Sequence, residues 1–126
     1  MGYQFKAGER VRRKKNSSLE SIYDVSPMYK VEKNTAALEF SYGGFADLCD
    51  KYDLNRIFNE GYNLKNGTFV PPLIHTEYDL IPITKFHIDK VKKINLSKVE
   101  DIALVQLLKA LIWAYENCKD PVLQMT

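Results

Sequence analysis

The residues with the clearest potential for chemistry are two histidines and the carboxylate beside one of them. His75 and Glu77 alternate along the chain, so a strand over residues 75–79 would place both side chains on one face. His87 could join them from a neighbouring strand and complete a set of two imidazoles and one carboxylate, which suits a transition metal. Solvated polar residues on the outer face of a sheet show the same spacing. We favour the solvated strand and keep a small metal- or ligand-binding enzyme centred on His75, Glu77 and His87 as an alternative function.

Recognised catalytic motifs are missing from the sequence. It contains no phosphate-binding glycine loop, no nucleophile elbow, no C-x-x-C pair and no H-E-x-x-H helix. Cys49 and Cys118 occupy apolar helical positions with no activating histidine nearby in sequence, so we expect them to be buried as small hydrophobic side chains. We therefore expect no catalytic residues and no cofactor, and we favour a binding protein over an enzyme.

Basic residues gather in two segments. Residues 1–15 have a net charge of +5 and residues 85–98 have +4, whereas residues 39–60 have −3. Two basic segments on one face could follow a phosphate backbone. The predicted nucleic-acid-binding residues are Arg10, Arg12, Arg13, Lys14, Lys15, Lys90, Lys92 and Lys93. Because the total charge is only +2 and no nucleic-acid-binding motif is present, this function is kept as an alternative.

The C-terminal helix is the element that the sequence predicts most clearly. Ser97 followed by Glu100 is typical of a capping box, in which each residue satisfies a free backbone N–H at the start of a helix. Residues 98–118 contain neither Gly nor Pro, and Pro121 disfavours helical backbone at the residue before it. We predict a helix over residues 97–118.

This helix is apolar on two sides. The predicted core face comprises Ala103, Leu104, Leu107, Leu108, Ala110, Leu111, Ala114, Tyr115 and Cys118. The opposite arc mixes apolar side chains with polar ones, and a helix that is apolar on both sides is normally buried on both sides. Either the N-terminal arm or residues 61–76 cover this second face, or a second copy of the chain does so. In the latter case the predicted interface consists of Ile102, Val105, Lys109, Ile112, Trp113 and Glu116.

The rest of the chain alternates short strands with turns. Predicted strands cover residues 9–13, 21–25, 29–33, 37–42, 78–83 and 84–88, and Asn66-Gly67 predicts a hairpin turn. A helical stretch is predicted over residues 45–60, either as one helix or as two short ones with Asp53 capping the second. The predicted fold is α+β, with several short, mainly antiparallel strands, a short middle helix and a long C-terminal helix packed on the sheet. We expect a single domain over residues 1–126, in which residues 1–15 form a basic N-terminal arm or an edge strand.

Composition and the N-terminal segment suggest the compartment and the origin of the protein. With 126 residues, 45% hydrophobic and 27% charged, the chain suits one globular domain rather than a disordered one. The N-terminus is polar and basic, which predicts no signal peptide and a cytoplasmic location with reduced cysteines. Lys outnumbers Arg 14 to 4, a usage associated with bacterial or phage genes. We expect a small non-catalytic binding or regulatory protein of bacterial or phage origin that acts through protein–protein contact as a homodimer.

Overall fold

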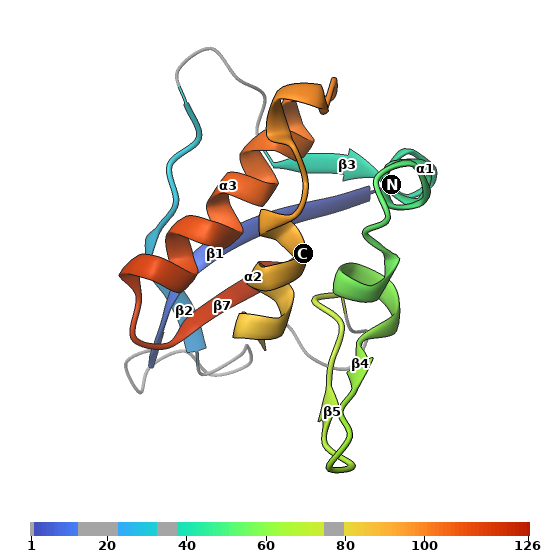
Figure 1. The fold of residues 1–126 in the computed structure, drawn as a ribbon. Helices are drawn as coiled ribbons and strands as arrows, with labels where there is room; N and C mark the ends of the chain where they lie inside the picture. Colours follow the sequence, from blue (N-terminus) through green and yellow to red (C-terminus); the bar gives the residue numbers. More distant parts are fainter. Residues whose placement is uncertain (1, 13–22, 33–37, 75–79) are drawn as a thin grey trace.

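The protein has an α+β fold in which helices pack on an antiparallel sheet, as the sequence predicted (Figure 1). The structure is a computed structural model that describes residues 2–12, 23–32, 38–74 and 80–126. The main sheet contains β1 (Gly2–Arg12), β2 (Tyr23–Met28), β3 (Glu39–Ser41), β6 (Leu80–Pro82) and β7 (Pro121–Met125). The helices are α1 (Tyr42–Lys51), α2 (Lys85–Lys92) and α3 (Ile102–Asn117), with a π-helical turn at Arg56–Glu60 and a 3-10 turn at Leu96–Lys98. A separate small hairpin is formed by β4 (Tyr62–Asn63) and β5 (Phe69–Val70).

The longest strand, β1, is central to the sheet. The strand order is β2-β1-β7-β6, and β3 pairs with the first residues of β1. The prediction of an N-terminal arm or edge strand is therefore wrong for residues 2–12. The high density of charge suggested an open edge, but β1 pairs with β7 on one side and with β3 and then β2 on the other.

The hydrophobic core lies between this sheet and the helices. Strand alternation turns Phe5 and Ala7 of β1 toward the helices, where both are buried, and leaves Lys6 exposed. An aromatic cluster closes one end of the core, with ring centroids 5.0 Å apart in both Phe40–Phe45 and Phe45–Phe58. Such tilted and edge-on ring contacts contribute beyond simple burial.

Helix α3 begins later than predicted. Ser97 does not cap it, because this residue lies in the 3-10 turn and donates its hydroxyl to Asn95 Oδ1 at 2.6 Å. Asp101 is the N-cap instead, and its carboxylate accepts the backbone N–H of Leu104 at 2.9 Å. The intervening Val99 has extended backbone and only 8% exposure, so a continuous helix from residue 97 would remove its side chain from the core. The predicted end near residue 118 is close to the observed end at Asn117.

The structure corrects or completes the predictions for several other segments. Residues 85–92 form α2 rather than part of a strand, because Thr84 and His87 cap a helix there. Of the two possibilities for residues 45–60, the structure has two separate helical segments, divided after α1 where Asp53 has a φ of 56°. Strand β7 was not predicted. The Asn66-Gly67 hairpin turn is confirmed, since Gly67 has a φ of 86° between β4 and β5.

Gly8 lies where β2 comes close to the backbone of β1. A Cβ on Gly8 would sit 2.1 Å from the backbone oxygen of Pro27, which cannot move without disturbing the sheet. Gly8→Ala is therefore expected to lower the free energy of unfolding by about 1–3 kcal/mol, the usual cost of overpacking. Gly43→Ala is the control, because nothing lies within 4 Å of its Cβ position on α1 and Ala favours a helix by about 0.5–1 kcal/mol. Urea denaturation measures the free energy of unfolding of both variants, and equal changes would contradict the close packing of β2 at Gly8.

Candidate functional site

The six predicted interface residues share the side of α3 that faces away from the core. The buried residues of the helix are Leu104, Gln106, Leu107, Leu108, Ala110, Leu111 and Ala114. At 3.6 residues per turn, the direction opposite this buried arc passes through Lys109 and Glu116, with apolar side chains on both sides of that line. We call this surface the outer face of α3, and it consists of Ile102, Val105, Lys109, Ile112, Trp113 and Glu116.

The outer face keeps apolar surface accessible to solvent. Ile102 is 62% exposed, the highest value among the large hydrophobic residues found exposed in the described structure. Val105, Ile112 and Trp113 are half-buried, because their inner atoms pack against the core. Scattered apolar residues are ordinary on a protein surface, whereas four apolar side chains on both sides of Lys109 and Glu116, on one helix face, are more typical of an interaction site.

Residues 29–32, which we call the flanking segment, run beside one edge of the outer face. Tyr29 donates its hydroxyl and Glu32 its backbone N–H to the same side-chain oxygen of Gln106, each at 3.0 Å. These two bonds explain why Gln106 is only 2% exposed on a helix arc expected to be polar. The Tyr29 ring also meets Trp113 edge-on, with centroids 6.0 Å apart.

The flanking segment answers part of the question left open by the sequence. Cover on this edge comes from residues 29–32, a segment other than the N-terminal arm and residues 61–76 that we had expected for a monomer. The segment was predicted as a strand, yet residues 29–32 lie beyond the end of β2, where the Tyr29 backbone N–H still donates to the Ala7 carbonyl oxygen at 2.8 Å. Its hydrogen bonds to Gln106 join residues 74 and 77 positions apart, a separation that no local sequence pattern encodes.

Both charged residues of the outer face form ion pairs with neighbouring elements. Lys109 Nζ lies 2.8 Å from Glu32 Oε1, and Glu116 Oε1 lies 3.5 Å from Lys92 Nζ of α2. The hydrogen bond with Lys109 lowers the pKa of Glu32 and raises the pKa of Lys109. Exposed pairs of this kind add little to stability. Their effect here is that the outer face and its two partners together carry no net charge.

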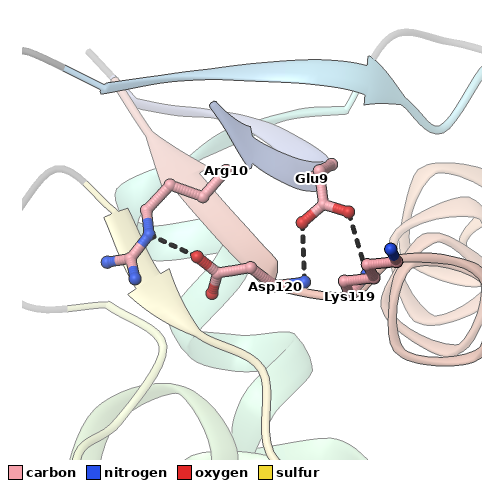
Figure 2. A network of polar contacts seen from close by, with 4 residues as sticks. All are labelled: Glu9, Arg10, Lys119 and Asp120. Carbon is pink, nitrogen blue, oxygen red and sulfur yellow. Dashed lines mark hydrogen bonds and ion pairs between the residues drawn. The ribbon is translucent and has the colours of Figure 1, made fainter. Parts of the chain in front are cut away.

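A polar network fixes the residues that follow α3 to β1 (Figure 2). The Glu9 carboxylate accepts the backbone N–H groups of Lys119 at 2.8 Å and Asp120 at 2.6 Å. Arg10 Nε lies 2.7 Å from Asp120 Oδ2, and the Arg10 backbone N–H donates to the Asp120 carbonyl oxygen at 3.0 Å. The Arg10 guanidinium also lies 5.0 Å from the centroid of the Tyr23 ring. Arg10, a predicted nucleic-acid ligand, is thus engaged within its own chain.

The remaining basic residues that the structure describes are divided between β1 and the α2 region. Arg12 is exposed, and strand alternation places it on the side of the sheet opposite Ala7, whereas α2 packs on the Ala7 side. On α2, Lys90 pairs with Asp53 at 3.2 Å, and Lys93 is exposed. Lys92 is the partner of Glu116 described above. Arg13, Lys14 and Lys15 lie outside the described residues.

His87 has an internal structural role. It is fully buried, its Nδ1 accepts the backbone N–H of Thr84 at 3.0 Å, and its Nε2 donates to the Pro71 carbonyl oxygen at 2.9 Å. Burial lowers the pKa of His87, which favours the neutral imidazole that this bonding requires. The predicted metal partners His75 and Glu77 lie outside the described residues. Within the described part of the chain, no three His, Cys, Asp or Glu side chains are grouped to hold a metal ion.

Neither cysteine has the properties of a nucleophile. Cys49 is fully buried as expected, and burial raises the pKa of its thiol to about 12. Cys118 is half-buried, and its thiol pKa is also raised by burial. A thiol is reactive only as its thiolate, and a raised pKa keeps it protonated near neutral pH.

Comparison with known proteins adds no functional information. The chain matched no family model, no curated protein and no solved structure. Among the described residues, no helix has the length and apolar character needed to cross a membrane. The outer face of α3 and its surroundings are therefore the basis for the proposed function.

The bonding of His87 predicts a pH dependence of stability. Its pKa is lower in the folded protein than the ordinary value of 6.5, so the unfolded chain binds the extra proton first. Stability is then fully present above pH 6.5 and falls as the pH drops toward the folded pKa, by at most about 1.4 kcal/mol per pH unit. Urea denaturation between pH 7 and 5 should show this slope in the wild type and in His75→Gln. A His87→Gln variant that keeps the full slope would contradict the assignment.

The Glu9 carboxylate is expected to stabilise the end of α3 measurably. Glu9→Ala leaves the backbone N–H groups of Lys119 and Asp120 without their acceptor and should lower the free energy of unfolding by about 1–3 kcal/mol. Glu39→Ala, at an exposed position on β3, is the matched control and should change it by less than about 0.5 kcal/mol. Equal losses in urea denaturation would show that the Glu9 contacts contribute nothing specific.

Proposed function

We propose that the protein is a small, non-catalytic binding protein that acts through protein–protein contact and pairs with a second copy of itself through the outer face of α3. The observation that carries this proposal is the set of four apolar side chains on that face, of which Ile102 is 62% exposed. Its charged members are already paired with Glu32 and Lys92, so approach of another apolar surface leaves no unpaired charge among them. Twofold dimers are the commonest protein assemblies, and a neutral, apolar face is compatible with its own copy.

The exposure of the four apolar residues sets the expected affinity. Complete burial of such a side chain stabilises by about 1.5–3 kcal/mol. Only Ile102 is mostly exposed, because the other three are half-buried in the single chain and would gain less. Since association costs roughly 4–15 kcal/mol, the dimer should have micromolar rather than nanomolar affinity. Weak, reversible pairing of this kind suits a regulatory protein.

We infer the compartment and the origin of the protein from its cysteines and its composition. Both cysteines are free, which supports a reducing compartment such as the cytoplasm. The bacterial or phage origin rests on the ratio of Lys to Arg. Nucleic-acid binding has less support as a function, because Arg10 and Lys90 are engaged in ion pairs and Arg12 lies on the other side of the sheet from α2.

Measurement of molecular mass against concentration tests the proposal. In light scattering, the wild type should rise from 14.6 kDa toward twice that value over tens of micromolar. Ile102→Asp should stay monomeric, and it should fold, because Asp is favourable in the first turn of a helix. Ile112→Asp, nearer the middle of the face, should also be monomeric.

A control variant distinguishes loss of the outer face from the general effect of an added surface charge on dimerisation. Ala46→Asp adds the same charge at an exposed position on α1 and should dimerise like the wild type. A wild type that remains monomeric throughout this concentration range would refute the proposed dimer.

A further inference from the structure

Lys109 occupies the middle of the outer face of α3. It stands seven residues after Ile102 and seven before Glu116, which are the two ends of the face. In any twofold pairing centred on this face, residues near the middle approach their own copies, whichever way the two helices run. A dimer would therefore bring two lysine side chains together close to its axis.

Two uncompensated lysines at that position would oppose pairing. Like charges brought together in a partly desolvated interface weaken binding several-fold or more, and proteins commonly use them to exclude wrong partners. The structure supplies a compensating charge, because Glu32 Oε1 lies 2.8 Å from Lys109 Nζ.

Glu32 is held in place by contacts other than the ion pair. Its backbone N–H donates to the side-chain oxygen of Gln106 at 3.0 Å, and the same oxygen accepts the Tyr29 hydroxyl at 3.0 Å. Because Gln106 is only 2% exposed, these bonds fix the flanking segment along the edge of the outer face. The carboxylate is thus positioned before any partner arrives, which lowers the entropic cost of neutralising Lys109.

We propose that Glu32 determines the specificity of the dimer by neutralising Lys109 of its own chain, so that the outer faces of two copies can pack about a twofold axis near Lys109. This inference rests on the dimer proposed above and goes further by naming the residue that permits self-recognition. A second copy of the chain fits such a surface because it presents the same neutral centre with apolar residues on either side.

Removal of the Glu32 charge is the central test. In sedimentation equilibrium at low salt, Glu32→Gln should raise the dimer dissociation constant roughly tenfold, because it leaves both copies of Lys109 unpaired. The backbone bond to Gln106 does not depend on the Glu32 side chain, so the variant should keep the wild-type fold, which urea denaturation verifies. The loss should shrink at high salt, since salt screens repulsion between charges.

A second substitution distinguishes charge repulsion from lost structure. Glu32→Gln combined with Lys109→Gln removes both charges and should return the dissociation constant to within about threefold of the wild type. Asp53→Asn is the matched control, because it breaks a similar 3.2 Å pair with Lys90 away from the outer face and should leave dimerisation unchanged.

The possible results separate this inference from the proposed function. A wild-type monomer would overturn both. A wild-type dimer that Glu32→Gln does not weaken, or a double variant as weak as Glu32→Gln alone, would overturn the role of Glu32 and leave the dimer standing.

Discussion

The two-sided pairing of β1 is the constraint on which the rest of the structure depends. This strand bonds to β7 along one side and to β3 and β2 along the other, and its inward residues Phe5 and Ala7 form the base on which the helices pack. Glu9 then binds the connection that follows α3 (Figure 2). One strand therefore sets both the sheet and the position of the helix that carries the outer face.

The outer face is the part of α3 that the described elements cover incompletely. The sheet and α2 pack against the helix and the flanking segment lies along one edge, while Ile102 is still 62% exposed. The side-chain oxygen of the buried Gln106 accepts two hydrogen bonds, which Tyr29 and Glu32 donate. The same two residues contact Trp113 and Lys109, so the bonds to one buried oxygen also arrange the surface beside it.

Local periodicity predicted much of the fold and the membership of the outer face. The helical spacing from residue 102 onward separates the buried leucines from the six outward residues without any knowledge of the tertiary structure. The same reasoning missed β7, since a five-residue strand that begins with Pro121 and buries Gln124 has no clear alternating pattern. It also placed β1 at an edge, because the internal partner of Arg10 lies 110 residues away. Long-range partners decide such cases, and short windows of sequence do not contain them.

The pairing of β1 with β7 has a consequence for how quickly the molecule folds. Helix α3 consists of local contacts and can form within microseconds, whereas the hydrogen bonds between Gln4 and Thr126 join positions 122 apart. Closing so large a loop costs chain entropy before any contact repays it, and proteins rich in such distant pairs fold slowly. The rate-limiting barrier should therefore lie in the meeting of the two ends of the chain, with the helices already largely formed.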